Sequence, residues 1–470
     1  MRILVAIANY GFKQMECLSM LIGEYQSMPC EIDLVVLTDV HKIFNSDIEV
    51  SIGLPTKNPW SLPFGHKRIF AERMANYDLF IYSEDDILIT WKNIESFLEL
   101  TGVLPDGYIS GFLRYEVLSN GTKWYPDFLG PYHWFPKSLK KIGRHSFAEF
   151  SNLHSACYML TRHQLQRVIS SGKYLVEPHQ GRYDLLCSAA TDPYTQCGLK
   201  KVICISQIDD MLVHHLSNRY AGQLGINQSD FEIQVSSMLS TEYDSKSQDD
   251  LFIPTKEINH IRWDKVYFDK ADQKLLSLVP DETENVLSIG CAYPASELSL
   301  AQNKHRVTVI PMDSIVGMLA SSKGIEVTEP NFINAFHKLQ GTLFDCIIFS
   351  EVLQHLEEPL DILSRAVKLL AAEGVLLVSV PNFRYLKVAK DHFPYPFLKR
   401  WTYSENYLQM IDKKQILEWF RLLGVQVIDY QYVIESQKLK RIRPLSEFFS
   451  ALFATRLMVK GKKYFNQITS

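Results

Sequence analysis

The sequence predicts an α/β protein built from two doubly wound, mainly parallel-sheet domains. Short apolar runs alternate with helical patterns in both halves of the chain, and strands that alternate with helices form largely parallel sheets. A length of 470 residues allows two or three hydrophobic cores rather than one. The most linker-like stretch spans residues 236–250. We therefore expect one domain at 1–235, a linker at 236–255 and a second domain at 256–470.

The first half contains apolar runs that have the length of buried strands. They lie at residues 3–8 and 32–37, in a run that ends at Tyr82, and at residues 108–112 and 202–205. Helical patterns lie between these runs, for example at residues 67–74. This alternation predicts a parallel sheet with connecting helices.

A second series of runs begins at residues 285–290 and continues to the end of the chain. The expected strands lie at residues 285–290, 306–310, 345–350, 374–380, 425–428 and 457–459. Helical patterns at residues 360–370 and 413–423 lie between them. The second half therefore predicts another open α/β sheet.

Composition and charge exclude several classes of protein. Hydrophobic residues make up 46% of the chain and charged residues 22%, which is typical of a globular protein and not of a fibrous one. A net charge of −4 argues against nucleic-acid binding, which usually requires a basic excess. The eight cysteines have no zinc-type spacing and indicate reduced thiols in a cytoplasmic protein.

The sequence offers little sign of membrane insertion. No apolar run has the length of a transmembrane segment, and the run at residues 1–8 is too short for a signal peptide. A basic stretch at residues 438–443 precedes several apolar side chains, and we interpret it as the last helix of the fold. An amphipathic helix on the inner membrane surface is the alternative. We expect a cytoplasmic protein with at most peripheral membrane contact.

Three consecutive acidic residues, Glu84, Asp85 and Asp86, follow the strand that ends near Tyr82. Ligands of open α/β sheets bind at the carboxyl ends of strands. In an extended segment Glu84 and Asp86 point the same way, because the side-chain period is two. Two such carboxylates suit Mg²⁺ or Mn²⁺ that holds a diphosphate. The alternative is an acidic turn after a strand.

Residues that suit a nucleotide follow the first two strands and open the next helix. Asn9 and Tyr10 follow the first strand and Asp39 follows the second, at the edge where a nucleoside would bind. Ordinary turn chemistry is the alternative for these three. Lys67 lies at the start of a helix, where a phosphate is favoured, and its neighbour Arg68 has the spacing to pair with a glutamate one turn along.

Two further positions carry side chains suited to metal binding or proton transfer. His214 and His215 follow the expected strand at 202–205, and a neutral imidazole is a good third ligand for a divalent ion. Only one of the two histidines should reach the metal, because neighbouring residues of an extended chain face opposite ways. Asp192 lies in an expected turn before a helix, as a general base or a helix cap.

Together these features resemble metal-dependent glycosyltransferases of the A-type fold. The resemblance rests on the order of the opening strand, the acidic triplet, Asp192 and the later histidines, and on an acceptor-side segment at residues 154–162. It implies a nucleotide-sugar donor held by Glu84, Asp86 and a metal ion, with Asp192 taking the proton of the acceptor hydroxyl. The triplet departs from the family pattern, which has Asp at its first and third positions.

The second half resembles class I methyltransferases, which have a Rossmann-like fold and use S-adenosylmethionine. The resemblance rests on residues 344–356 and 370–382, and it implies that Gly290 brings backbone close to the cofactor. The family pattern has an acid followed by three alternating glycines, whereas this chain has Ser288, Gly290, Ala292 and Pro294.

A second departure from the methyltransferase pattern concerns the ribose of the cofactor. Pro311 replaces the acid that would bind its hydroxyls, and Asp313 two residues on is the substitute. The two departures together predict a retained fold with a weakened cofactor pocket.

These resemblances lead to one main interpretation and one alternative. The main interpretation is a metal-dependent glycosyltransferase of polysaccharide biosynthesis, whose acceptor is a glycan or a lipid-linked glycan. Its methyltransferase-like domain then either methylates the same glycan or has no catalytic role. The alternative is an S-adenosylmethionine-dependent methyltransferase whose N-terminal domain only binds the glycan.

Overall fold

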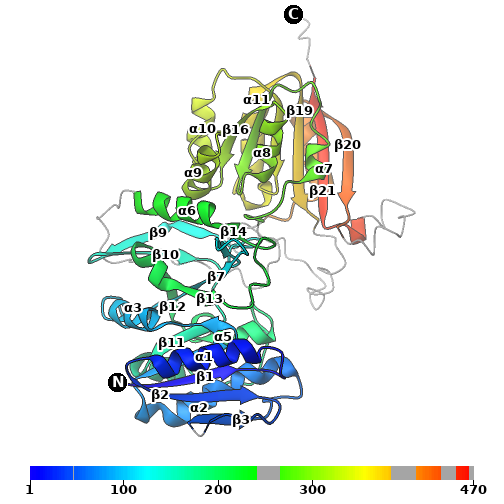
Figure 1. Ribbon diagram of the computed structural model, residues 1–470. Helices are drawn as coiled ribbons and strands as arrows, with labels where there is room; N and C mark the ends of the chain where they lie inside the picture. Colours follow the sequence, from blue (N-terminus) through cyan, green and yellow to red (C-terminus); the bar gives the residue numbers. More distant parts are fainter. Residues whose placement is uncertain (46, 241–264, 383–408, 436–450, 465–470) are drawn as a thin grey trace, which may run out of the picture. The chain divides into compact units, whose positions relative to one another are not determined.

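The computed structural model describes residues 1–45, 47–240, 265–382, 409–435 and 451–464. The chain divides into two compact units, Met1–Ile261 and Arg262–Ser470 (Figure 1). Helix α6 (Gln228–Ser240) occupies residues 236–240 of the expected linker. Residues 241–255 of that linker and the basic stretch at 438–443 lie outside the described residues.

The first unit contains a five-stranded sheet in the order β11-β4-β1-β2-β3. Its strands are β1 (Arg2–Ala8), β2 (Glu31–Thr38), β3 (Ile48–Ile52), β4 (Leu79–Glu84) and β11 (Cys157–Thr161). The first four are parallel, and β11 is antiparallel to β4. Because β1 and β4 are interior strands covered on both faces, they are almost wholly buried and read as continuous apolar runs. Helices α1 (Met15–Ser27) and α2 (Gly65–Arg73) belong to the connections between these strands.

Two further sheets complete the described part of the first unit. One has the order β6-β12-β10-β9, with β6 (Tyr108–Ser110), β12 (Lys200–Cys204), β10 (His145–Phe150) and β9 (Trp134–Ile142). The other has the order β14-β8-β7-β13-β5, with β14 (Ile226–Asn227), β8 (Lys123–Tyr125), β7 (Leu113–Val117), β13 (Leu212–His215) and β5 (Ile87–Leu88). The expected strands at 108–112 and 202–205 pair with each other here and do not join the N-terminal sheet. The described part of the first unit is therefore a mixed α/β structure of three sheets, and the expectation of one doubly wound sheet is corrected.

The described strands of the second unit form one seven-stranded sheet in the order β17-β16-β15-β18-β19-β21-β20. The strands are β15 (Asn285–Cys291), β16 (Arg306–Pro311), β17 (Glu326–Val327), β18 (Phe344–Ser350), β19 (Leu370–Pro381), β20 (Val425–Val433) and β21 (Arg456–Lys463). In this described sheet β21 runs antiparallel to both β19 and β20, and the other neighbouring strands are parallel. The prediction of an open, mainly parallel sheet is confirmed for this half.

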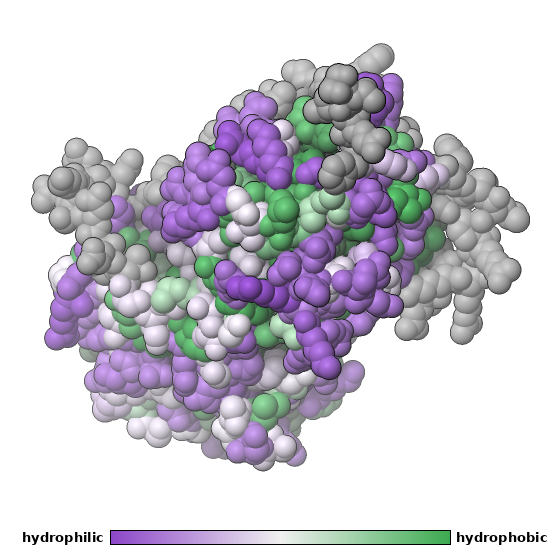
Figure 2. Space-filling model, turned by 90° about the horizontal axis from the view of Figure 1, so that it is seen from above, coloured by the Kyte–Doolittle hydropathy of each residue, from purple (hydrophilic) through white to green (hydrophobic). Residues whose placement is uncertain are grey.

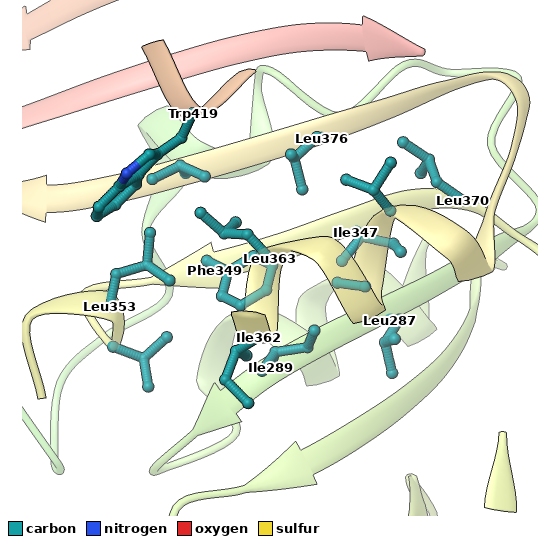
Figure 3. Close-up of a cluster of buried hydrophobic side chains, with 14 of the residues drawn as sticks. Leu287, Ile289, Ile347, Phe349, Leu353, Ile362, Leu363, Leu370, Leu376 and Trp419 are labelled. Atoms are coloured by element: carbon teal, nitrogen blue, oxygen red, sulfur yellow. The ribbon is translucent and has the colours of Figure 1, made fainter. Parts of the chain in front are cut away.

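Helices lie on both faces of this sheet (Figure 1). The described helices between its strands include α8 (Ala295–Gln302), α9 (Ser314–Ser322), α10 (Phe332–Lys338), α11 (Pro359–Leu369) and α14 (Lys413–Leu422). The central strands send alternate side chains into two separate cores. Leu287 and Ile289 of β15 pack with Leu363 of α11 (Figure 3), whereas Val286 faces the opposite cluster, which contains Leu300 of α8. Burial on both faces is the reason why β15 reads as an unbroken apolar run.

The strand order reverses beside β15. The chain moves through β16 and β17 on one side of β15 and then returns to its other side with β18. The connections that leave the carboxyl ends of β15 and β18 therefore diverge. Open α/β sheets bind their ligands in the crevice at such a point.

The surface drawn in Figure 2 is mostly hydrophilic, with hydrophobic residues scattered among polar ones. Scattered apolar side chains are normal on a protein surface. In the described part of the chain, no helix combines the length and the apolar character that crossing a membrane requires.

Candidate functional site

The acidic triplet of the first unit lies at the carboxyl end of the N-terminal sheet. Glu84 is the last residue of β4, and Asp85 and Asp86 form the turn into β5. Ala8, the last residue of β1, lies opposite Glu84 in the parallel register. Asn9 therefore follows at the same edge, and its Nδ2 donates to Asp85 Oδ2 over 2.5 Å.

The loops after β1 and β2 meet at this edge too. The carboxylate of Asp39 accepts a 2.8 Å hydrogen bond from the backbone of Gly11, and Tyr10 beside it is 51% exposed. The ammonium group of Lys42 donates to the backbone and side-chain oxygens of Asn9. The three residues expected to hold a nucleoside, Asn9, Tyr10 and Asp39, are thus close together, and Lys42 adds a cation that sequence reasoning missed.

His215 reaches the triplet from β13. The antiparallel pairing of β13 with β5 places His215 opposite Ile87, and its Nε2 lies 3.0 Å from Asp86 Oδ2. The other ring nitrogen, Nδ1, lies 2.6 Å from Glu116 Oε1. His214 faces the other side of the strand, where its ring stacks on Tyr115 with the centroids 4.7 Å apart. His214 is therefore not at the acidic site.

Burial and mutual repulsion perturb the carboxyl groups of the triplet. Burial, followed by the charge of Asp86, raises the pKa of Glu84 to about 8. Burial also raises the pKa of Asp85 to about 7. Among the described residues, Glu84 Oε1 has no hydrogen-bond partner. Carboxyl groups perturbed in this way are concentrated at functional sites.

Asp86 and His215 behave as an ion pair. Burial by itself raises the pKa of Asp86, but the hydrogen bond and charge of His215 outweigh it and hold that pKa below its ordinary value. Burial likewise lowers the pKa of His215, but its bonds to Asp86 and Glu116 outweigh burial and raise that pKa. The pair therefore favours a protonated imidazole between two carboxylates.

Strand β7 supplies two charged residues that sequence reasoning missed. Glu116 accepts from His215, and Arg114 forms a buried ion pair with Asp127 over 2.7 Å. Residues two apart in a strand share a face. The sequence signal was the alternation Leu113-Arg-Tyr-Glu-Val117, in which two charged residues share one side of a strand between apolar ends.

The described residues of the first unit provide no complete divalent-metal site. Within the described ranges, no group of three or more His, Cys, Asp or Glu side chains is placed to hold a metal ion. Asp86 and His215 come together, but the second nitrogen of His215 is bound to Glu116. The expected Mn²⁺ or Mg²⁺ is therefore not supported by the arrangement of these side chains.

Asp192 and Lys67 occupy different surroundings from those expected. Helix α5 (Leu185–Thr195) begins after Asp184, whose side chain caps it, so Asp192 lies inside the helix rather than before one. Asp192 and Lys67 form a buried ion pair, and His179 Nε2 lies 3.3 Å from the other oxygen of Asp192. The charge of Lys67 is neutralised by Asp192, which argues against its expected contact with a phosphate.

The second unit has a pocket at the crevice beside β15 and β18. It is lined by residues of the β15–α8 connection, by the end of β18, by residues 265–276 and by Arg456 at the start of β21. Gly290 lies near the carboxyl end of β15, where the pairing with β16 is irregular, and its φ is +78°. A Cβ there would overlap the side chain of Val352. This position therefore requires glycine on two grounds, backbone conformation and space.

The pocket carries charges of both signs. Arg456 Nη1 lies 2.5 Å from Asp272 Oδ2, and its Nε lies 3.6 Å from Glu351 Oε1. The ammonium group of Lys265 donates to the backbone oxygen of Ser350. Burial raises the pKa of Glu351, whose backbone has the left-handed φ of +51°. Strained backbone of this kind is concentrated at functional sites.

Asp313 and Pro294 take up positions at helix starts. Asp313 Oδ1 accepts from the backbone nitrogens of Ile315 and Val316, which caps α9. Burial raises the pKa of Asp313 to about 6. Pro294 directly precedes α8, and a proline costs little there because the first turn has no intrahelical partner for its nitrogen.

Comparisons with known proteins bear on the second unit. Residues 263–430 match the family model described as a methyltransferase domain. No curated protein matches the chain. The family model does not extend to residues 1–262.

Several solved structures are similar to about two fifths of this chain. One is an S-adenosylmethionine-dependent methyltransferase from Archaeoglobus fulgidus, at 15% identity over 39% of this chain and 87% of that one, with a TM-score of 0.32. Another is the N-methyltransferase NodS from Bradyrhizobium japonicum in complex with S-adenosylhomocysteine, at 17% identity over 40% and 84%, with a TM-score of 0.29. A third is an S-adenosylmethionine-dependent methyltransferase from Mesorhizobium loti, at 12% identity over 40% and 96%, with a TM-score of 0.30.

The family match and the mainly parallel sheet with its reversal beside β15 agree with each other. Residues 263–430 match a methyltransferase domain, and the described part of this region has an open, mainly parallel α/β sheet.

Proposed function

We propose that the protein is an S-adenosylmethionine-dependent methyltransferase whose N-terminal unit binds the molecule to be methylated, a glycan or a lipid-linked glycan. One observation carries the proposal. The methyltransferase domain has a charged pocket at the point where β15 and β18 diverge, which is the ligand position of open α/β sheets.

The side chains of the pocket fit the amino-acid end of S-adenosylmethionine, which carries an ammonium and a carboxylate. Lys265 and Arg456 supply positive charge, and Glu297 supplies negative charge. Asp313 remains the candidate for the ribose hydroxyls through Oδ2, because Oδ1 accepts both capping hydrogen bonds. When bound, the cofactor supplies an activated methyl group.

Glu351 is the group best placed to accept a proton from the acceptor. It lies directly after β18 and lines the pocket. Burial raises its pKa, and a carboxylate of raised pKa is a stronger base than an ordinary one. Arg456, at 3.6 Å, is positioned to stabilise the charged form of Glu351 before the proton is taken up.

Calorimetric titration of the full chain with S-adenosylmethionine tests the proposal. We expect micromolar binding, which corresponds to roughly −8 kcal/mol. S-adenosylhomocysteine should bind as well, because it keeps the adenosine and the amino-acid end. A folded sample, checked by circular dichroism, that binds neither compound would overturn the proposal.

A second candidate function belongs to the N-terminal unit. The raised pKa values of Glu84 and Asp85, beside the Asp86–His215 ion pair, favour a reaction or binding site there. We propose transfer of a sugar from a nucleotide-sugar donor, with Asn9, Tyr10 and Asp39 contacting the nucleoside. Asp192 keeps its proposed role as proton acceptor only if the ion pair with Lys67 opens.

Nucleotide-sugar turnover separates this second candidate from the first. The assay measures release of UDP from UDP-sugars or of GDP from GDP-sugars, with and without a metal chelator. It compares wild type with Asp86→Asn and with the control Asp106→Asn. Asp106 is a matched control because it lies on the surface and pairs with Arg167. Turnover that is lost in Asp86→Asn alone would support sugar transfer, and absence of turnover in wild type would remove it.

A further inference from the structure

Strand β15 lacks an acidic side chain at position 288, but a carboxylate is present at the same place. Ser288 is the buried fourth residue of β15. Its hydroxyl donates a hydrogen bond to Glu297 Oε1 over 2.6 Å. Glu297 is itself only 7% exposed. The two side chains together therefore present one carboxylate where a single acidic residue of the strand would have presented it.

The carboxylate of Glu297 comes from the next element along the chain. Helix α8 begins directly after Pro294, and Glu297 lies in its first turn. A carboxylate in the first turn of a helix is stabilised by the helix dipole and by free backbone nitrogens. Glu297 also lines the pocket. The short connection from β15 to α8 thus places an acid from the helix beside a hydroxyl from the strand.

Two other carboxylates of the pocket, Asp272 and Glu351, lie close to Arg456. Asp272 lies 2.5 Å from Arg456, and Glu351 lies 3.6 Å from the same guanidinium. The ammonium of Lys265 donates to the backbone oxygen of Ser350, although its charge also interacts with Glu297. Glu297 accepts from the neutral hydroxyl of Ser288. A buried carboxylate is bound favourably by a cation that approaches it directly, so a ligand cation at this place would be stabilised.

We propose that Glu297 binds the ammonium group of S-adenosylmethionine, and that Ser288 holds its carboxylate in position. This inference rests on the proposed cofactor binding of the second unit. Glu297 of helix α8 then supplies the negative charge that Ser288 of strand β15 does not carry. This explains how a pocket with an altered β15 connection can still bind the zwitterionic amino-acid end of S-adenosylmethionine.

Calorimetry with two ligands tests the role of Glu297. S-adenosylmethionine carries the ammonium, whereas 5′-methylthioadenosine has the same nucleoside and sulfur without the amino-acid part. Glu297→Gln should weaken binding of S-adenosylmethionine roughly 10- to 100-fold, the range of a charge-assisted hydrogen bond. Binding of 5′-methylthioadenosine should be unchanged. An equal loss for both ligands, or no loss for either, would overturn the inference.

A second variant restores the charge from the strand. Ser288→Asp in the Glu297→Gln background should recover most of the affinity for S-adenosylmethionine. The double variant also tests the inference if Glu297→Gln alone folds poorly. Failure of this double variant to exceed Glu297→Gln, with both folded, counts against the inference. Asp269→Asn is the control, because Asp269 lines the same pocket but is exposed.

The outcome distinguishes this inference from the proposed function. If wild type binds neither ligand, cofactor binding itself fails. If wild type and Glu297→Gln bind S-adenosylmethionine equally, cofactor binding stands and the role of Glu297 falls.

Discussion

His215 Nε2 lies 3.0 Å from Asp86 Oδ2, and this contact joins the acidic turn after β4 to strand β13. The ring continues to Glu116 on β7 through Nδ1 at 2.6 Å. One imidazole therefore connects two carboxylates, and the three groups come from three segments that are distant in sequence. A buried charge is stabilising only while its partners are in place, so this contact couples the organisation of the site to the folding of the first unit.

Replacing His215 by Ala should destabilise the first unit by roughly 3–5 kcal/mol, because it leaves Asp86 and Glu116 buried without their counter-charge. His214→Ala is the matched control. It removes a half-buried ring stacked on Tyr115 and should cost about 1 kcal/mol. Urea unfolding of both variants measures the difference. Equal destabilisation would show that the two histidines contribute equally to the free energy of unfolding and that the Asp86–His215 ion pair adds nothing to it.

The pH dependence of stability should identify Glu84. Its pKa is about 8 in the folded protein against an ordinary value of 4.5. Between these values the unfolded chain has released the proton that the folded chain retains, so stability falls as the pH rises from 4.5 to 8. Glu84 contributes on the order of a few kcal/mol to this fall.

The variant Glu84→Gln does not titrate and should flatten this pH profile. Urea unfolding between pH 5 and pH 9 measures it for both proteins. We expect the variant to gain stability relative to wild type toward pH 9. Parallel profiles for the two proteins would exclude Glu84 as the titrating group.

The extent to which the site was predictable follows from how far apart its parts lie in sequence. The acidic triplet was visible because an apolar run and the acids after it are one local pattern. Its contact with Asn9 was predictable as well, because parallel strands end at the same edge. Lys42, Arg114 and Glu116 were missed because their environment is created by segments that meet only in the folded chain.

Asp192 illustrates a different cause of error. Pro193 after it indicates a turn that precedes a helix, since proline is favoured near a helix start. The helix instead begins at Leu185 and continues through Pro193 to Thr195. Tertiary packing decides this, because Asp192 is fully buried against Lys67. In the second unit the strand pattern was sufficient for the fold, but the hydrogen bond between Ser288 and Glu297 could not be predicted, because it forms only when the helix folds back beside the strand.

The Lys67–Asp192 ion pair should show strong coupling in a double-mutant cycle. Lys67→Met leaves the carboxylate of Asp192 buried beside His179 alone, at 3.3 Å, and should cost roughly 3–5 kcal/mol. The double variant Lys67→Met with Asp192→Leu removes both charges and should recover most of this loss. Thermal and urea unfolding of the single and double variants supply the cycle. Additive effects of the two substitutions would mean that the ion pair contributes no net coupling.

Gly290→Ala should reduce both the stability of the second unit and its binding of S-adenosylmethionine. Alanine at φ +78° is strained by about 1 kcal/mol, and its Cβ would overlap Val352, which adds roughly 1–3 kcal/mol of overpacking. Gly324→Ala is the matched control, since its φ is +83° but, its two neighbours in the chain aside, no described residue has an atom within 4 Å of the added Cβ. The control should therefore show the conformational strain alone and should bind the cofactor as wild type does. Adding Val352→Ala to Gly290→Ala makes room for the new Cβ and should restore part of the stability. If Gly290→Ala and Gly324→Ala are equally stable and bind equally well, the close packing of the end of β15 against Val352 is not what requires glycine there.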